Sequence, residues 1–111
     1  MFVKDLEPAE VSALLADPDA FELIDVRTPG EMAGGILPHA RGMPMSVLPL
    51  RLDEIPKDKQ VVFYCRTGAR SAQVCMYLGQ RGYDNVYNLR GGIVTWAQCG
   101  LEIAPGDTLR P

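Results

Sequence analysis

Residues 61–71 read Val61-Val62-Phe63-Tyr64-Cys65-Arg66-Thr67-Gly68-Ala69-Arg70-Ser71. Four apolar residues lead directly into a cysteine and a short loop, and residues 72–78 continue in a pattern that is typical of a helix. A continuous apolar run that ends at a turn indicates a strand buried on both faces, as in a parallel sheet. Because ligands bind beyond the carboxyl ends of such strands, we predict that Cys65 lies at the mouth of a ligand-binding loop.

The residues around Cys65 predict an activated thiol. The thiolate is the nucleophilic form, and a free cysteine with a pKa of about 8.5 is mostly protonated at neutral pH. The charges of Arg66 and Arg70, the N-terminus of the following helix and inward-pointing loop N–H groups all favour the thiolate and an anion bound to it. Gly68 allows the loop to bend tightly. A purely structural role as a buried cysteine at the end of a strand would explain Cys65, but not the two arginines and the glycine that follow it. We therefore interpret Cys65 as a nucleophile.

Length and composition indicate one globular domain. The chain has 111 residues, of which 47% are hydrophobic and 23% are charged, as in ordinary globular proteins. The net charge of −3 gives no electrostatic basis for a nucleic-acid partner. Residues 1–60 hold six Lys/Arg and eleven Asp/Glu, whereas residues 61–111 hold five Arg and three Asp/Glu. The local positive excess therefore lies in the half that carries Cys65, which suits an anionic ligand.

The remaining reactive side chains are few. Cys65, Cys75 and Cys99 are the three cysteines, and an odd number without short spacing argues against a disulfide scaffold or a zinc site. His39 is the only histidine and is expected to be a solvated loop residue. We expect no metal or other cofactor and no membrane partner, because no apolar run is long enough to span a bilayer. The start lacks a signal-peptide pattern, so the predicted location is the cytoplasm, which keeps a thiol reduced.

Strands and helices are expected to alternate along the chain. The expected strands cover residues 2–3, 21–26, 61–64 and 85–89, with a very short one within 41–44. The expected helices begin at residues 7–8, 29–31 and 91–92, with a short helix in 47–55 broken near Pro49 and a longer one over 69–81. This order predicts right-handed βαβ units and an α/β fold with a sheet covered on both faces. Residues 1–104 are predicted to form one domain, followed by a loosely held tail at 105–111.

Two charged residues lie at the carboxyl end of the expected strand 21–26, Asp25 within it and Arg27 directly after it. Asp25 and Arg27 should lie at the same sheet edge as Cys65, because carboxyl ends of parallel strands meet at one edge. We favour a structural ion pair for Asp25, since a buried aspartate is usually paired. Arg27 stays open between that role and a functional one.

The position of Cys75 on the expected helix indicates a different role from that of Cys65. Cys75 shares one face of the helix over 69–81 with Ser71, Ala72 and Leu78. We therefore predict a core cysteine, with a resolving thiol as the alternative. Trp96 is predicted to fill the core.

Three segments, in order and covering almost the whole chain, resemble the rhodanese-like family in its single-domain bacterial form. They are Leu23-Ile24-Asp25-Val26-Arg27-Thr28-Pro29 with Glu31, residues 62–71, and Val86-Tyr87-Asn88-Leu89 followed by Gly91-Gly92 and Trp96. One departure is that the family often has Gly-His-Ile where this chain has Gly34-Gly35-Ile36, with about one extra residue before Ala40.

The resemblance implies a five-stranded, mainly parallel sheet with helices on both faces, and it implies sulfurtransfer. Cys65 would take the outer sulfur of thiosulfate or of a low-molecular-weight persulfide. The resulting persulfide would pass its sulfur to a thiol, to a sulfur-carrier protein or to cyanide. The implied binding residues are Arg66, Thr67, Gly68, Ala69 and Arg70. Those expected to support the loop are Asp25, Arg27 and Ser71.

Two alternatives use the same thiol. A sulfur-carrying or sulfur-sensing domain would be loaded by a protein partner without turnover of small donors. Cysteine phosphatases and related arsenate reductases carry five residues between Cys and Arg, whereas four residues separate Cys65 from Arg70. The resemblance thus points to a smaller loop, which suits a sulfur atom better than a phosphate, and no aspartate is visibly placed as a leaving-group acid.

Overall fold

A parallel sheet of five strands forms the centre of the computed structural model, which describes residues 3–111. The strand order is β1-β5-β4-β2-β3, and every strand pair is parallel. The strands are β1 (Asp5–Leu6), β2 (Phe21–Asp25), β3 (Arg41–Gly42), β4 (Gln60–Tyr64) and β5 (Val86–Leu89). The predicted α/β class is confirmed. The first strand begins later than predicted, and residue 2 of the predicted strand lies outside the described residues.

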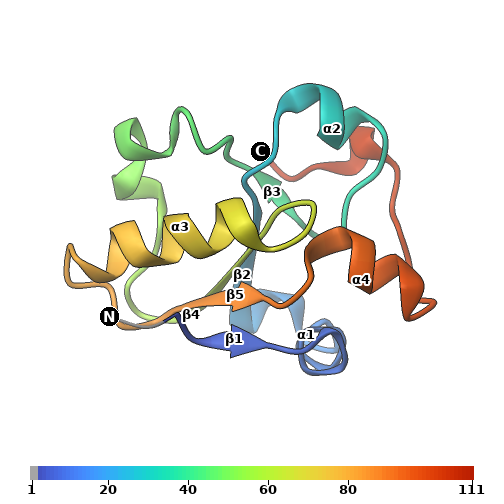
Figure 1. Ribbon diagram of the computed structural model, residues 1–111, viewed down its shortest axis with the longest axis horizontal. Helices are drawn as coiled ribbons and strands as arrows, with labels where there is room; N and C mark the ends of the chain where they lie inside the picture. Colours follow the sequence, from blue (N-terminus) through green and yellow to red (C-terminus); the bar gives the residue numbers. More distant parts are fainter. Residues whose placement is uncertain (1–2) are drawn as a thin grey trace.

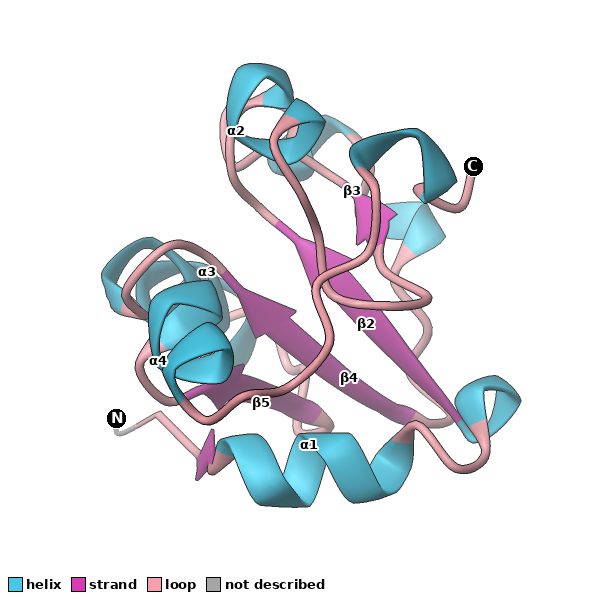
Figure 2. Ribbon diagram, turned by 90° about the vertical axis from the view of Figure 1, so that its right-hand side faces the viewer, coloured by secondary structure: helices cyan, strands magenta, loops and turns pink. Residues whose placement is uncertain are grey.

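Helices cover both faces of the sheet, as predicted. They are α1 (Pro8–Leu14), α2 (Pro29–Ala33), α3 (Ala69–Gly79) and α4 (Gly92–Gln98). Figure 1 shows α3 along one face of the sheet and α1 on the opposite side, and Figure 2 shows β5, β4 and β2 side by side. Among the described helices, none is long and apolar enough to cross a membrane.

The alternation of side chains along β4 builds two separate cores. Val62 and Tyr64 pack on one face with residues of α1, α2 and α4, among them Val11 and Trp96. Val61, Phe63 and Cys65 pack on the other face with α3. Because both faces are covered, β4 is apolar throughout its buried part. The predicted buried positions of Cys75 and Trp96 are confirmed, with 4% and 1% of their surfaces exposed.

The register of β2 and β4 decides what lies beside Cys65. Phe21 pairs with Gln60 at one end, and Asp25 pairs with Tyr64 at the other. The backbone continues this contact, because the Val26 N–H donates to the Tyr64 carbonyl at 3.0 Å. The carboxyl ends of the two strands are therefore level, and the segment after β2 lies next to Cys65.

The short helix predicted within residues 47–55, broken near Pro49, is 3₁₀ rather than α. These residues form two 3₁₀ turns, Leu48–Leu50 and Leu52–Glu54, closed by i→i+3 hydrogen bonds such as Arg51 N–H to Leu48 O at 2.9 Å. Pro49 lies in the first turn, where its missing N–H costs no helical hydrogen bond, and 3₁₀ turns are a common form of such short connectors.

The last residues are held by specific contacts, where the sequence predicted a loosely held tail. The Arg110 N–H donates to the Ala40 carbonyl at 2.9 Å, which extends the sheet beyond β3 through a bridge to Arg41. The Ala104 N–H donates to the Ile36 carbonyl at 2.7 Å. The short edge strand β3 leaves backbone groups unpaired, and this segment satisfies some of them. The residue pattern of the segment itself could not show that.

Candidate active site

Cys65 immediately follows β4 and lies at the centre of a ring of hydrogen-bond donors. Its Sγ accepts from the Gly68 N–H at 3.1 Å, from the Ser71 N–H at 3.5 Å and from the Ser71 hydroxyl at 3.3 Å. The residue is only 1% exposed. A negative charge that forms on this sulfur therefore meets several N–H and O–H groups without relying on bulk water.

The loop is held in this shape by the start of α4. Gly68 has a φ of +104°, a backbone conformation that is strained for any residue with a Cβ. On the side of α4, the Ile93 N–H donates to the Cys65 carbonyl at 3.0 Å, and the Val94 N–H donates to the Arg66 carbonyl at 3.1 Å. These two carbonyls point toward α4, away from the ring of donors at the sulfur. The approach is close enough that a Cβ on Gly92 would lie 2.5 Å from both carbonyl oxygens.

Hydrogen bonds lower the pKa of Cys65. Burial acts to raise the pKa of its thiol, but hydrogen bonds from the Ser71 hydroxyl and from the N–H groups of Ser71, Gly68 and Thr67 outweigh burial, so the pKa lies below its usual value. The sequence suggested arginine charge, the helix N-terminus and loop N–H groups as causes. In the structure the directed hydrogen bonds are the main favourable contributions.

A chain of polar groups leads from the buried Ser71 through the buried Asn88 to Asp5 at the surface. The Ser71 hydroxyl donates to Asn88 Oδ1 at 2.5 Å, and Asn88 Nδ2 donates to Asp5 Oδ1 at 3.1 Å. Because the Asp5 oxygen accepts from Nδ2, it orients the Asn88 amide with its oxygen toward Ser71. The sequence does not predict Asn88 as a site residue. The available signal was an amide within an otherwise buried strand, because a buried amide needs a partner.

The single Ser71 hydroxyl hydrogen has three acceptors within reach, namely Cys65 Sγ, the Gly68 carbonyl at 3.4 Å and Asn88 Oδ1. This sharing predicts pKa changes of opposite sign for two variants. Ser71→Ala removes a donor and should raise the pKa of Cys65 by about 1 to 2, since a hydrogen bond to a charged group contributes about 1.5–3 kcal/mol. Asn88→Ala removes the nearest competing acceptor and should lower this pKa. Thiolate absorbance against pH, in a Cys99→Ser background, measures both. A shift in the same direction for both variants would contradict the sharing of the hydroxyl.

Arg70 lies in the first turn of α3 and is paired with Glu31. Its two terminal nitrogens donate to the two Glu31 carboxylate oxygens at 2.8 and 2.9 Å. This hydrogen bonding lowers the pKa of Glu31 to about 2, so the carboxylate is ionised at any physiological pH. Glu31 belongs to the first of the three family segments, but the sequence does not predict it as a site residue. Its spacing from Thr28 indicates only the helix cap that it also forms.

Asp25 and Arg27 form a buried ion pair beside the loop. Arg27 donates to both Asp25 carboxylate oxygens at 2.8–3.1 Å and to the Gly35 carbonyl at 2.6 Å. Burial acts to lower the pKa of Arg27, but the hydrogen bond and charge of Asp25 raise it overall. The pair connects the end of β2 to the loop at residues 34–35, the stretch that departs from the family's pattern.

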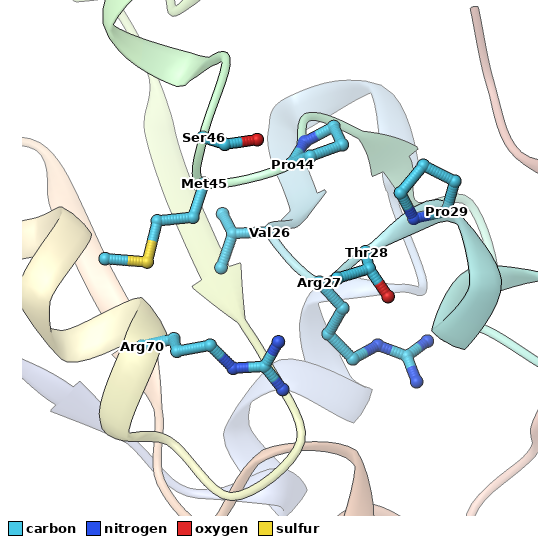
Figure 3. Close-up of a pocket in the computed structure, with 8 residues that line it drawn as sticks. All are labelled: Val26, Arg27, Thr28, Pro29, Pro44, Met45, Ser46 and Arg70. Atoms are coloured by element: carbon cyan, nitrogen blue, oxygen red, sulfur yellow. The ribbon is translucent and has the colours of Figure 1, made fainter.

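The other loop residues differ in exposure. Arg66, Thr67 and Ala69 are exposed, whereas Gly68 is buried. Beside Arg70 lies a cleft of about 350 Å³, shown in Figure 3. Its lining residues are Val26, Arg27, Thr28, Pro29, Pro44, Met45, Ser46 and Arg70. Backbone hydrogen bonds connect the walls of the cleft to the end of β4. The Met45 N–H donates to the Val26 carbonyl, and the Val26 N–H donates to the Tyr64 carbonyl.

The other cysteines and the histidine take no part in this arrangement. Cys75 is a free, buried thiol, and burial raises its pKa to about 12. Cys99 is free and exposed. His39 lies in the loop before β3 with a φ of +67°. Within residues 3–111, no group of three or more His, Cys, Asp or Glu side chains could hold a metal ion.

Comparisons with known proteins agree on one family. The family described as "Rhodanese-like domain" matches residues 7–99. A protein of Allochromatium vinosum named "Sulfurtransferase" is 52% identical over 101 residues, which cover 91% of this chain and 94% of that protein. A rhodanese-like domain protein from Staphylococcus aureus has a TM-score of 0.80 and 35% identity, over 91% of this chain and 98% of that one. A thiosulfate sulfurtransferase from Pseudomonas aeruginosa has a TM-score of 0.87 and 29% identity, over 97% of this chain and 21% of that one.

Proposed function

The chain belongs to the rhodanese-like family, and we propose that it is a sulfurtransferase whose nucleophile is Cys65. The observation that carries the proposal is the ring of donors around this sulfur, at 3.1–3.5 Å from Gly68 and Ser71. The relative named "Sulfurtransferase" supports the reaction class. The donor, the acceptor and the roles of individual residues follow from the chemistry of the loop.

In the first half-reaction the Cys65 thiolate attacks the outer sulfur of the donor. A bond forms between Sγ and this sulfur, and the bond between the two donor sulfurs breaks. The electron pair leaves with sulfite when the donor is thiosulfate, or with a thiolate when it is a persulfide. The N–H groups of residues 66–70 would stabilise the negative outer sulfur of the new persulfide, much as an oxyanion hole stabilises oxygen.

In the second half-reaction an acceptor thiolate attacks the outer sulfur of the persulfide. Cys65 is now the leaving group, and a thiol with a lowered pKa leaves faster. The hydrogen bonds from Ser71 and Gly68 therefore serve both halves of the cycle. The acceptor would be a small thiol or a sulfur-carrier protein, and we place the reaction in the cytoplasm, where reducing conditions keep Cys65 free.

Two alternatives use the same thiol and are separated by what reacts with it. A carrier or sensor domain would accept sulfur only from a protein partner and would not turn over small donors. A cysteine phosphatase would form a phosphocysteine and would leave thiosulfate unused. The four residues between Cys65 and Arg70 favour the binding of a sulfur atom over that of a phosphate.

Intact-protein mass spectrometry after incubation with thiosulfate, and separately with glutathione persulfide, tests the proposal. We expect a gain of roughly 32 Da, one sulfur atom, that maps to Cys65 and is lost on adding cyanide. The donor that loads Cys65 identifies the substrate. No gain with either donor would refute catalysis on small donors and would shift weight to a partner-loaded domain or a phosphatase.

A further inference from the structure

Two of the arginines at the site, Arg70 and Arg27, form ion pairs with carboxylates. Arg70 gives two of its five N–H donors to the Glu31 carboxylate, and Arg27 is held by Asp25 and the Gly35 carbonyl. Among the described residues, Arg66 makes no ion pair and is exposed. A dianion such as thiosulfate therefore meets an Arg70–Glu31 pair of zero net charge, and the ionised Glu31 carboxylate beside Arg70 repels its sulfonate.

The cleft beside Arg70 offers a different kind of contact. Val26, Pro29, Pro44 and Met45 give it apolar walls, and Figure 3 shows Val26, Met45 and the stem of Arg70 around the same opening. Thiosulfate has no apolar part that could use these walls. A hydropersulfide R–S–SH presents an outer sulfur to Cys65 and an organic group R that can bury apolar surface.

We propose that Glu31 is a specificity-determining residue, which disfavours thiosulfate by holding Arg70, and that the adjoining cleft binds the organic group of a hydropersulfide donor. This inference rests on the proposed sulfurtransfer. It adds that the preferred donor carries an apolar group. The sulfur chemistry is unchanged: the outer sulfur bonds to Sγ, and the R–S thiolate leaves and takes a proton from water.

Glu31→Gln tests the role of the carboxylate. Glutamine keeps an oxygen for the Thr28 N–H, which Glu31 Oε1 accepts at 3.1 Å, but it removes the negative charge from Arg70. Exposed ion pairs are weak, so we expect loading by thiosulfate to become about five- to tenfold faster at low salt, and less so at high salt. Loading by benzyl hydropersulfide, whose organic group carries no charge, should stay within about twofold, which also shows that the variant is folded.

Met45→Ser tests the cleft, with Met76→Ser as the matched control. Met76 lies on α3, is 42% exposed and does not line the cleft. Loading by benzyl hydropersulfide should slow about fivefold in Met45→Ser, from the loss of roughly 40 Å² of apolar contact, and should be unchanged in Met76→Ser. Loading by thiosulfate should be unchanged in both variants.

The outcomes separate this inference from the proposed function. Wild-type protein that loads benzyl hydropersulfide faster than thiosulfate, with the two selective changes above, supports it. Loading by every donor with ratios that neither variant alters would overturn the roles of Glu31 and the cleft, and would leave sulfurtransfer intact. Wild-type protein that loads sulfur from none of the three donors would overturn both.

Discussion

A Cys65→Ser variant is expected to gain no sulfur from any donor and to lose at least about a thousandfold of its turnover. The reason lies in the ring of donors, which stabilises a thiolate but supplies no base. Hydrogen bonds from Ser71 and Gly68 lower the pKa of the Cys65 thiol below its usual value. A serine hydroxyl is a far weaker acid, so the same hydrogen bonds leave it protonated and poorly nucleophilic.

Cys75→Ser is the matched control. This thiol is one turn of α3 beyond Ser71 and packs in the same core as Cys65, and its pKa is raised to about 12. We expect Cys75→Ser to load sulfur at nearly the wild-type rate, with some loss of stability from a buried hydroxyl. Peptide mapping of the added mass in both variants decides the matter. Sulfur retained in Cys65→Ser, or lost in Cys75→Ser, would move the nucleophile away from Cys65.

The parts of the fold that could be predicted are those written in local pattern. The apolar run before Cys65 required burial on both faces, and β4 has it. Pro8 placed the start of α1, and the helical spacing of Cys75 placed it in the core. Residues 47–55 also carry apolar residues, but a proline in a short connector leaves several compact turns open, and packing selects among them.

The parts of the site that could not be predicted join residues far apart in sequence. Glu31 meets Arg70 only because α2 and the Cys65 loop share one edge of the sheet. Asn88 meets Ser71 and Asp5 only because β5 lies between β1 and β4. Strand order is not visible in one sequence, so a carboxylate that reads as a helix cap and an amide that reads as a strand residue give no sign of these partners.

The same reasoning applies to the second large effect, at Gly92. Sequence alone shows Gly91-Gly92 as the start of a helix, whereas the structure shows Gly92 pressed against the backbone of the Cys65 loop. A Cβ there would lie 2.5 Å from the Cys65 and Arg66 carbonyl oxygens. Neither oxygen is the end of a flexible side chain, so relief requires the start of α4 and the loop to separate.

Gly92 also has a φ of +61°. Gly92→Ala should therefore lower the free energy of unfolding by about 2–5 kcal/mol, because the alanine would be strained in this left-handed conformation and overpacked against the loop. It should also raise the pKa of Cys65 toward its ordinary value. Without the hydrogen bonds from α4 to the two loop carbonyls, the loop N–H groups would no longer point at Sγ.

Gly82→Ala is the matched control, since Gly82 has a φ of +88° and a Cβ at that position would have no atom within 4 Å. That variant should lose only about 1–2 kcal/mol and leave the pKa unchanged. Chemical denaturation and thiolate titration of both variants measure the difference. Equal losses of stability, with an unaltered Cys65 pKa in Gly92→Ala, would show that α4 does not shape the loop.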